Sequence, residues 1–287
     1  MFAEIMQRPR PLIMGILNVT PDSFSDGGLF SDPERALLHA QDMVRQGADL
    51  IDVGAESTRP GAFPTSAAEQ IARIVPVIEA LRHSIQGDIL ISLDTSLAEV
   101  AAAGLDAGAS IINDITAGRG DPGLLNLAAE SGAPVVLMHM QGTPRTMQDS
   151  PHYRDVVEEV LGFLLERAAA AQAAGIPREH IILDPGIGFG KRQSDNLVLL
   201  ANLNRFTATG YATLLGTSRK RFMGAICNEA SPRELVSATV ATSALGVMAG
   251  VKLFRVHDIR ENRQALDVAY AIKQASSIGN GLPTYGD

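Results

Sequence analysis

The sequence has very little cysteine and few aromatic residues. Of its 287 residues one is cysteine (Cys227), none is tryptophan, and 5% are aromatic. A single cysteine cannot pair within its own chain, so a disulfide-bonded scaffold is excluded. Proteins that bind single-stranded nucleic acids stack the bases on aromatic side chains, and this chain offers few of them.

Basic residues are not in excess either. The chain has 24 Lys and Arg against 32 Asp and Glu, which gives a formal net charge of −8. Because nucleic-acid binding relies on basic surface to neutralise phosphates, we expect no nucleic-acid partner. The net charge does not identify a small-molecule ligand, because a few cations at one site can bind an anion in an acidic chain.

No hydrophobic run is long enough to cross a bilayer. The most apolar stretch, residues 237–251, is shorter than the roughly 20 residues that a spanning helix needs. Residues 1–11 lack the pattern of a signal peptide, since they include Glu4 and no small-residue cleavage site. We therefore expect a soluble, cytoplasmic protein. The stretch 237–251 is rich in small residues, which allow close helix packing, and we expect a buried helix there or a helix-mediated homodimer.

The chain does contain enough apolar residues, 46%, to build a sizeable core. They form short β-branched runs that alternate with longer helical patterns, including helices that begin near residue 32 and cover 69–85. Glycines such as Gly47 and Gly108 stand at expected helix ends, where glycine is a common C-cap. The eight expected strands cover residues 12–19, 50–55, 90–95, 110–115, 134–140, 181–185, 212–218 and 253–257.

Eight strand–helix units in 287 residues correspond to about 36 residues each, the spacing of a (β/α)8 barrel. The strands are almost continuously apolar, as expected for parallel strands that helices cover. A doubly wound open sheet is the alternative, but the first strand does not lead into a glycine-rich dinucleotide loop. We therefore predict an α/β fold, a single-domain (β/α)8 TIM barrel over residues 1–287. Its core is expected at about 12–275, with poorly ordered ends at 1–11 and 276–287.

A polar residue stands at the end of every expected strand. Barrel enzymes build their active sites at these carboxyl ends. One such residue is typical of a cap or a turn, but polar side chains at all eight ends predict a binding site. They are Asn18; Glu56, Ser57, Thr58 and Arg59; Asp94; Asn113; His139; Asp184; Ser218, Arg219 and Lys220; and Arg255 and His257.

Four of these residues suit a flat heterocycle. Asp94 and Asp184 can accept hydrogen bonds from an amidine-like N–C–NH2 edge. Asn113 can both donate and accept, and Lys220 can donate to a ring carbonyl. An internal salt bridge between Lys220 and Asp184 is the alternative.

Three others suit an anion. Asn18, Arg255 and His257 lie on the first and last strands, which are neighbours in a closed barrel, and phosphate sites in this fold often lie near the last strands. Asn18 can also ligate Mg²⁺, which takes few protein oxygens and completes its shell with water and substrate phosphates. For Arg255 the alternative is a surface salt bridge with Asp258 or Glu261.

Two long loops, at residues 20–28 and 57–64, follow the first and second strands. Both are rich in Gly, Pro and Ser, and long loops at a barrel mouth are usually lids or substrate contacts. Residues 186–191 (Gly-Ile-Gly-Phe-Gly-Lys) look like a phosphate loop but match neither the Walker nor the dinucleotide pattern. The histidine spacing predicts no zinc site, and Ser218 lies in no Gly-x-Ser-x-Gly elbow of a serine hydrolase.

The strand-end residues resemble the motifs of a known family, dihydropteroate synthase. The similarity runs from the first strand to the last, essentially the whole chain. Two motifs are long and specific, and the others are short but fall in the same order at the strand ends. The segments are 18–28 (Asn-Val-Thr-Pro-Asp-Ser-Phe-Ser-Asp-Gly-Gly), 54–61 (Gly-Ala-Glu-Ser-Thr-Arg-Pro-Gly), 184–191, 218–220 and 255–257.

The resemblance implies a reaction, a cofactor and partners. The family joins 7,8-dihydropterin-6-ylmethyl diphosphate to 4-aminobenzoate, which releases diphosphate and gives 7,8-dihydropteroate in folate biosynthesis. Members of this family are Mg²⁺-dependent (β/α)8 barrels and are commonly homodimers. They are the targets of sulfonamides, which imitate 4-aminobenzoate. The resemblance therefore implies two small-molecule substrates, Mg²⁺ and a second copy of the chain.

The resemblance also implies roles for matching residues. The expected pterin-binding residues are Asp94, Asn113, Asp184 and Lys220. The expected diphosphate-binding residues are Asn18, which is also the Mg²⁺ ligand, Arg255 and His257. The residues expected to frame 4-aminobenzoate are Thr58, Arg59, Pro60, Phe189 and Ser218. The expected closing loop contains Asp22, Phe24 and Ser25. The expected catalytic residues are Asn18, Asp94, Lys220, Arg255 and His257.

Two other functions share part of this site. The methyltetrahydrofolate-binding barrel of a corrinoid methyltransferase has a similar pterin-binding set but needs a cobalamin partner and has no use for diphosphate loops. A non-catalytic pterin-binding paralogue keeps the pocket without the transfer. The two loop motifs argue against the first alternative, and the presence of Asn18, Arg59 and Arg255 argues against the second.

Overall fold

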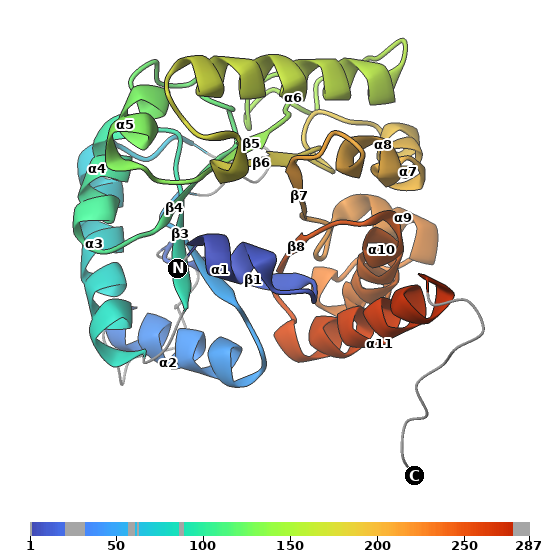
Figure 1. The fold of residues 1–287 in the computed structure, drawn as a ribbon, viewed down its shortest axis with the longest axis horizontal. Coiled ribbons are helices and arrows are strands. Elements are labelled where there is room, and N and C mark those ends of the chain that lie inside the picture. Colours follow the sequence, from blue (N-terminus) through green and yellow to red (C-terminus); the bar gives the residue numbers. More distant parts are fainter. Residues whose placement is uncertain (1, 21–31, 57–60, 62, 86–88, 278–287) are drawn as a thin grey trace.

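A computed structural model describes residues 2–20, 32–56, 61, 63–85 and 89–277. Eight parallel strands close into one barrel in the order β1 to β8, and the helices form a ring around it (Figure 1). The predicted (β/α)8 barrel is confirmed. The strands are β1 (Leu12–Asn18), β2 (Leu50–Gly54), β3 (Leu90–Asp94), β4 (Ile111–Asp114), β5 (Val135–Met138), β6 (Ile181–Asp184), β7 (Ala212–Leu215) and β8 (Leu253–Val256).

All eight strands lie where the apolar runs predicted them, but each is shorter than predicted. The largest differences are in β5, which covers Val135–Met138 rather than 134–140, and in β7, which ends at Leu215 rather than at residue 218. Ser218 and His257 therefore belong to the loops that follow β7 and β8. Apolar runs locate a strand better than they locate the last hydrogen bond of its ladder, because the chain can stay apolar after it leaves the sheet.

The helices fill the intervals between the strands. The expected second helix begins two residues early, at Ala67, because the Ser66 hydroxyl caps it by accepting from the Glu69 N–H at 3.3 Å. The helices are α1 (Phe2–Gln7), α2 (Asp32–Arg45), α3 (Ala67–Ser84), α4 (Ala98–Asp106), α5 (Leu124–Ser131), α6 (Val156–Ala173), α7 (Gln193–Ala201), α8 (Leu203–Thr207), α9 (Arg221–Cys227), α10 (Val236–Ala249) and α11 (Ile259–Ser277), with 3-10 turns at Arg178–His180 and Pro232–Leu235.

Strand side chains alternate between the barrel interior and the helices. In β8, Phe254 packs in the large cluster between the strands and the helices, while Leu253 belongs to the small apolar cluster inside the barrel. That interior cluster fills the amino-terminal half of the barrel with Leu12, Met14, Leu50, Leu90, Ile111, Val136, Ile182, Leu214 and Leu253. The carboxyl half contains buried polar side chains, among them Asp52, Asn113 and Asp184, and this end is the one that the sequence predicts to bind a ligand.

The prediction that residues 1–11 are poorly ordered is wrong for residues 2–11, the part of that segment that the structure describes. Residues Phe2–Gln7 form α1, which crosses the near end of the barrel in Figure 1. Its Ile5 is 1% exposed and packs into the interior cluster, so the core starts before residue 12. The physical reason is that the amino-terminal end of an eight-stranded barrel would leave this cluster open to water. At the other terminus α11 extends to Ser277, and residues 278–287 lie outside the described part of the chain.

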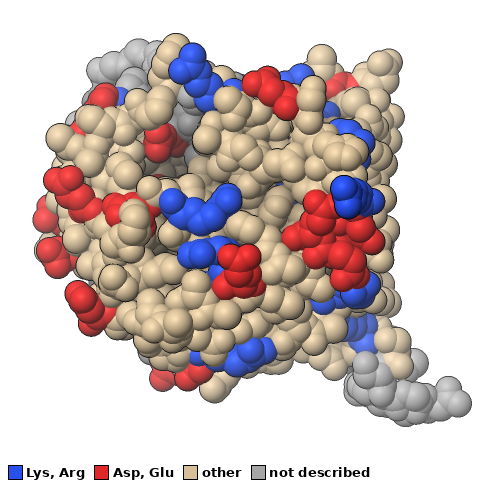
Figure 2. Space-filling model, turned by 90° about the horizontal axis from the view of Figure 1, so that it is seen from above, with Lys and Arg blue, Asp and Glu red and all other residues tan. Residues whose placement is uncertain are grey.

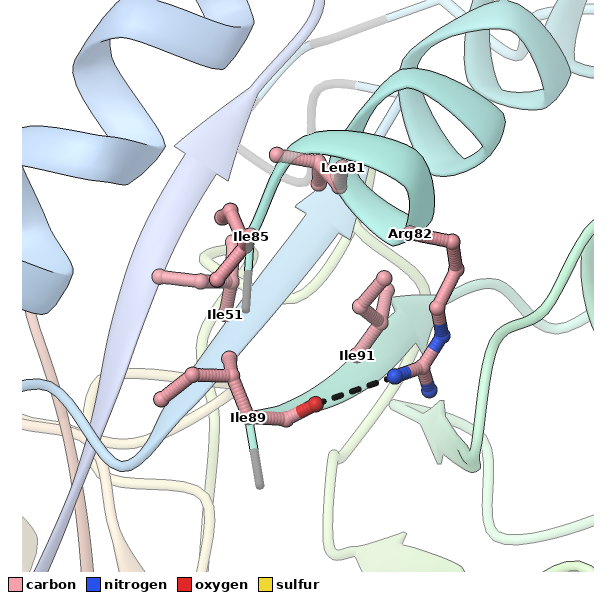
Figure 3. A pocket seen from close by; sticks show the side chains of 6 residues that line it. All are labelled: Ile51, Leu81, Arg82, Ile85, Ile89 and Ile91. Atoms are coloured by element: carbon pink, nitrogen blue, oxygen red, sulfur yellow. Dashed lines mark hydrogen bonds between the residues drawn. The ribbon is translucent and has the colours of Figure 1, made fainter. Parts of the chain in front are cut away.

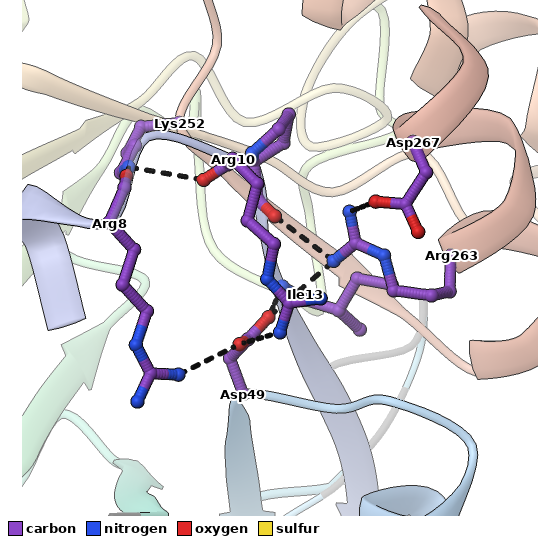
Figure 4. Close-up of polar contacts among 8 residues, drawn as sticks. Arg8, Arg10, Ile13, Asp49, Lys252, Arg263 and Asp267 are labelled. Carbon is purple, nitrogen blue, oxygen red and sulfur yellow. Dashed lines mark hydrogen bonds and ion pairs between the residues drawn. The ribbon is translucent and has the colours of Figure 1, made fainter. Parts of the chain in front are cut away.

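An ionic cluster fixes the segment after α1 to the barrel (Figure 4). The buried Asp49, at the start of β2, accepts hydrogen bonds from Arg10 at 2.7 Å, from Arg8 at 3.2 Å and from the Ile13 N–H at 3.0 Å. Arg263 of α11 forms an ion pair with Asp49 at 3.6 Å. One carboxylate therefore joins the amino-terminal segment, β1 and the last helix.

The predicted small-residue helix is α10. Its inner face packs closely on β8, since a Cβ at Gly246 would lie 2.7 Å from the Phe254 ring. The expectation of a buried face is thus confirmed. No helix within the described ranges is long and apolar enough to cross a membrane. On the face that Figure 2 presents, acidic and basic side chains lie among one another rather than in separate areas.

Candidate active site

The register of the sheet brings four strand ends side by side. Asn18 pairs with Gly54, Gly54 with Asp94, and Asp94 with Asn113 across β1 to β4. Gly54 has no side chain, and a Cβ there would lie 3.3 Å from the Cβ of Asp94. The glycine therefore leaves space beside the carboxylate, and the predicted polar residues of these strands share one edge of the barrel.

Arg255 connects two carboxylates inside the mouth. Its Nε donates to Asp52 Oδ2 at 2.6 Å, and its Nη2 donates to Asp94 Oδ2 at 2.8 Å. Asn113 Nδ2 donates to the same Asp52 oxygen at 3.1 Å. The predicted alternative for Arg255, a surface salt bridge with Asp258 or Glu261, is wrong, because the guanidinium turns into the barrel.

One guanidinium cannot neutralise both acids fully. Burial raises the pKa of Asp94 to about 7, Arg255 opposes the rise, and the neighbouring carboxylates, Asp52 foremost, add to it. Burial disfavours the charge on Arg255, but Asp52 and Asp94 outweigh it and raise the pKa of the guanidinium. Asp52 Oδ1 is buried and has no hydrogen-bond partner within the described chain. The mouth thus holds more carboxylate than its cation balances.

Asp184, at the end of β6, and Lys220, in the loop between β7 and α9, are the next polar groups of the mouth. The buried Asp184 accepts a hydrogen bond from the Gly186 N–H at 2.7 Å, and burial raises its pKa to about 6. Burial lowers the pKa of Lys220 to about 8. The Lys220 ammonium lies over the Phe189 ring, 4.0 Å from its centroid. The predicted internal salt bridge with Asp184 is absent from the ion pairs among described residues, so both groups keep capacity for a ligand.

Apolar side chains line the same side of the mouth. Met138, Met140 and Met147 form a buried cluster, against which Ile115 and Phe189 pack. Met138 lies directly beside Asp184 in the register of β5 and β6. A flat ring can therefore rest on thioether and aromatic surface while its edge meets polar groups, which is the usual composition of a small-molecule site.

His257 is held by Ser218. The His257 N–H donates to Ser218 Oγ at 3.1 Å, and the same hydroxyl lies 2.9 Å from His257 Nδ1. Because the hydroxyl already accepts from the backbone, its own proton is available to Nδ1, which leaves the Nε2 proton free to meet an anion. Burial first, then Arg219 and Arg255, lower the pKa of His257 to about 3. The imidazole is therefore a neutral donor near pH 7, not a cation.

Arg219 shapes the turn between β7 and α9. This residue has a positive φ of 58° and forms a two-pronged contact with Asp258, at 3.0 Å from Nε and 2.5 Å from Nη2. Its N–H donates to Thr239 Oγ1 of α10 at 3.0 Å. The pair joins the loops after β7 and β8 and so keeps Ser218 close to His257.

Some predicted site residues lie outside the described part of the chain, namely Asp22, Phe24, Ser25, Thr58, Arg59 and Pro60. Asn18 is described: it is half-buried at the end of β1, and its side-chain amide has no hydrogen-bond partner among the described residues. An unpaired amide oxygen at the mouth fits a cation that needs few protein ligands. No group of three or more His, Cys, Asp or Glu in the described ranges forms a metal cage.

A cavity of about 10 Å³ lies elsewhere, beside the amino-terminal ends of β2 and β3 (Figure 3). Its walls are apolar apart from Arg82, which donates to the carbonyls of Gly108 at 2.6 Å and Ile89 at 3.1 Å. These bonds use the guanidinium to satisfy the backbone. The cavity is a packing space at the end of the barrel opposite the mouth.

Three residues at or beside the mouth were not predicted from the sequence, namely Asp52, Met138 and Lys191. Asp52 stands inside an otherwise apolar strand, and a carboxylate in such a run is a usable signal, because buried charge needs a partner. Met138 offered no signal that separates it from ordinary core. Lys191 was visible in the glycine-rich segment that failed both phosphate-loop patterns.

Known proteins resemble this chain over most of its length. The family model described as "Pterin binding enzyme" matches residues 14–257. The dihydropteroate synthase of Escherichia coli (strain K12) is 46% identical over 265 residues, which cover 92% of this chain and 93% of that relative.

Solved structures give the same result. A Xanthomonas albilineans dihydropteroate synthase with 4-aminobenzoic acid superposes with a TM-score of 0.86 at 46% identity, covering 92% of this chain and 93% of that one. A Yersinia pestis dihydropteroate synthase in complex with a sulfonamide drug has a TM-score of 0.86 at 44% identity, covering 92% and 95%. The barrel, its polar mouth and these similarities agree, and the chain belongs to the dihydropteroate synthase family.

Proposed function

We propose that this chain is a transferase of folate biosynthesis that catalyses the dihydropteroate synthase reaction. It condenses 7,8-dihydropterin-6-ylmethyl diphosphate with 4-aminobenzoate and gives 7,8-dihydropteroate and diphosphate. The observation that carries the proposal is that polar groups surround an apolar wall at the mouth, in a chain 46% identical to a dihydropteroate synthase. The apolar wall consists of Met138, Met140, Met147 and Phe189. The whole chain, residues 1–287, is proposed to act as one pterin-binding domain.

The pterin is proposed to lie against the apolar wall with its edge toward the polar groups. Asp184 would accept from the amidine-like edge, Asn113 would donate and accept, and Lys220 would donate to the ring carbonyl. The support is that Asp184 is 6% exposed and Asn113 4% exposed. Buried groups of this kind select strongly for ligands that pair with them.

Arg255 and His257 are proposed to bind the diphosphate. A guanidinium has five N–H donors, and the contacts to Asp52 and Asp94 use two of them. The remaining donors can meet the anion without breaking either contact. His257 would add a neutral N–H. Together these groups would stabilise the negative charge that develops on the leaving diphosphate.

Asn18 is proposed to hold Mg²⁺ together with water and substrate oxygens, a ligand set that this ion accepts. When bound, the ion would supply positive charge that makes diphosphate a better leaving group. The unpaired amide at the end of β1 supports this role.

In the proposed substitution, the bond from the methylene carbon to the diphosphate oxygen breaks, and the oxygen keeps the electron pair. The electron-rich pterin shares the positive charge on the methylene, which Asp94 would favour when ionised. The neutral amine of 4-aminobenzoate then forms the C–N bond and releases a proton. Holding the two reactants in line is the main contribution of the protein.

Phe189 and Ser218 are proposed to frame 4-aminobenzoate with Thr58, Arg59 and Pro60. The loop that contains Asp22, Phe24 and Ser25 is proposed to exclude water.

We further propose a homodimer through α10 and α11. These helices pack on each other and leave large apolar side chains exposed, with Leu245 at 62% and Val268 at 61%. Met248 and Ile272 lie on the same two helices and are also exposed. Sedimentation of Leu245→Glu against the wild-type chain tests the proposal: a shift toward monomer supports it, and an unchanged species contradicts it. We also propose a cytoplasmic location. It is supported by the exposed thiol of Cys227, which is free, because thiols stay reduced in the cytoplasm.

The reaction is tested by diphosphate release. The wild-type chain is given pterin diphosphate with and without 4-aminobenzoate and Mg²⁺. Release that depends on both supports the synthase. Pterin binding without release would favour a non-catalytic paralogue, and methyl transfer to a corrinoid partner would favour the methyltransferase alternative.

A further inference from the structure

Lys191 is a buried lysine to which the proposed reaction gives no role. It lies in the loop between β6 and α7 and is 3% exposed. Its Nζ lies 2.9 Å from the Gly186 carbonyl oxygen, 3.1 Å from that of Phe189, and 2.9 Å from His139 Nδ1. The His139 carbonyl is 3.3 Å away. None of these partners in the described chain is a carboxylate, so the ammonium sits in a cage of neutral acceptors.

These contacts reach both sides of the proposed pterin site through one residue each. The Gly186 N–H donates to Asp184, while its carbonyl accepts from Lys191. The Phe189 carbonyl accepts from Lys191, while its ring supports the Lys220 ammonium at 4.0 Å. Lys191 therefore fixes the two loop residues that orient Asp184 and Lys220.

The shape of the loop makes such a donor necessary. Gly186 has a φ of 66°, and a Cβ there would lie only 1.9 Å from the His139 carbonyl oxygen, so the loop backbone packs directly on the end of β5. Carbonyl groups that turn into this contact are shut off from water. A buried carbonyl without a donor destabilises the fold, and the lysine supplies a donor to more than one such group.

The protonation states of Lys191 and His139 agree with this geometry. Burial, followed by the charge of Lys191, lowers the pKa of His139 to about 2, so the imidazole is neutral and its Nδ1 can accept. Burial lowers the pKa of Lys191 to about 7, and Asp184 opposes the change. The fold thus tolerates a buried amine whose charge it disfavours, which is expected where its hydrogen bonds are needed.

We propose that Lys191 is a positioning residue for the pterin site: its ammonium holds the carbonyls of Gly186 and Phe189 against β5 and so sets the places of Asp184 and Lys220. This inference rests on the proposed function, in which those two residues bind the pterin. It gives a role to the Gly-Ile-Gly-Phe-Gly-Lys segment, which is not a phosphate loop.

The test compares Lys191→Met with the wild-type chain. Binding of 6-hydroxymethylpterin is measured by fluorescence titration, and KM for pterin diphosphate is measured separately from kcat. We expect pterin binding to weaken and KM to rise by about tenfold to a hundredfold, with a smaller change in kcat, as for other residues that orient a binding group. The matched control is Lys252→Met, because Lys252 also donates to backbone carbonyls, those of Arg8 and Arg10, at the far end of the barrel. The control should keep wild-type pterin binding.

A lower Tm with unchanged Kd and KM in Lys191→Met would overturn the inference, since it would mark a merely structural lysine. A second variant keeps the test informative if Lys191→Met does not fold. Lys191→Ala is purified with n-propylammonium, which replaces the deleted side-chain atoms, or with tetramethylammonium, which has no N–H donor. Recovery of pterin affinity with n-propylammonium alone supports the inference, and equal results with the two ions contradict it. If the wild-type chain binds pterin but releases no diphosphate, the proposed function fails while the pterin titrations still decide the role of Lys191.

Discussion

The two ends of the barrel differ in how fully their charged side chains are paired. At the amino-terminal end Asp49 receives three hydrogen bonds, and two of its three arginine partners, Arg8 and Arg10, reach toward solvent. At the carboxyl end Asp94 and Asp184 are held with raised pKa values, and Lys220 is held with a lowered one. The first arrangement stabilises the fold. The second keeps groups short of partners, as expected where a ligand supplies the missing contacts.

The largest expected effect comes from removing a charge at the mouth. Lys220→Met should lower kcat/KM by about a thousandfold, because a half-buried donor to the pterin is lost. The free energy of unfolding should stay the same or rise by about 1 kcal/mol, because the fold no longer buries an amine whose charge it disfavours. Steady-state kinetics and urea unfolding of the same preparation measure both. A large loss of stability would erase the contrast between the two ends.

At the amino-terminal end the expected effect is on stability alone. Asp49→Asn keeps the size of the side chain but removes the charge that Arg8, Arg10 and Arg263 share. The free energy of unfolding should fall by about 3 kcal/mol, the usual cost of breaking a buried ion pair from one side. The value of kcat/KM, measured well below the Tm, should not change. A loss of activity in the fully folded variant would show that the two ends are coupled.

The third prediction concerns pH. Because burial raises the pKa of Asp94 to about 7 from its ordinary value of 3.8, the folded chain binds this proton more tightly than the unfolded chain does. The contribution of Asp94 to stability is fully present below about pH 4 and is lost as the pH rises through about 7. The unfolding free energy of the wild-type chain minus that of Asp94→Asn should therefore decline as the pH rises over that window. Urea titrations at several pH values would contradict the raised pKa if the difference grew instead.

The smallest effect is expected on the outside of the ring of helices. Arg45 and Asp42 of α2 form an exposed ion pair at 3.1 Å, with 70% and 47% of the side chains accessible. Arg45→Ala should change the unfolding free energy by less than about 0.5 kcal/mol, because water and salt screen such pairs. Urea unfolding under the conditions used for Asp49→Asn provides the comparison. A change as large as that of Asp49→Asn would show that burial does not set these energies.

Much of the fold could be predicted from the sequence because it depends on local patterns. The strands are apolar runs of β-branched residues, and the polar residue at each end marks the mouth. The helix α1 could not be predicted in this way, because Ile5 finds its apolar neighbours only when the barrel closes over it. The segment α1 is apolar at Phe2, Ala3, Ile5 and Met6, but a run of only six residues at a terminus gives no local sign of what it packs against.

Site residues that belong to a sequence motif could be predicted one by one. Contacts between residues far apart in the sequence could not. Arg255 and Asp52 stand 203 positions apart, so nothing local to Arg255 indicates that it turns toward an acid inside the barrel. His257 was predicted to bind an anion, but its charge state could not be predicted, because its pKa depends on burial, which only the folded chain determines. Lys191 shows the same limit, since its acceptors are backbone carbonyls that carry no sequence signature.

The most direct test of the division between the two ends is a titration of 6-hydroxymethylpterin into the wild-type chain, Asp184→Asn and Asp49→Asn. The expected result is one pterin per wild-type chain, the same affinity in folded Asp49→Asn, and an affinity at least about a hundredfold weaker in Asp184→Asn. Equal affinity in Asp184→Asn and the wild-type chain would contradict the placement of the pterin at the mouth.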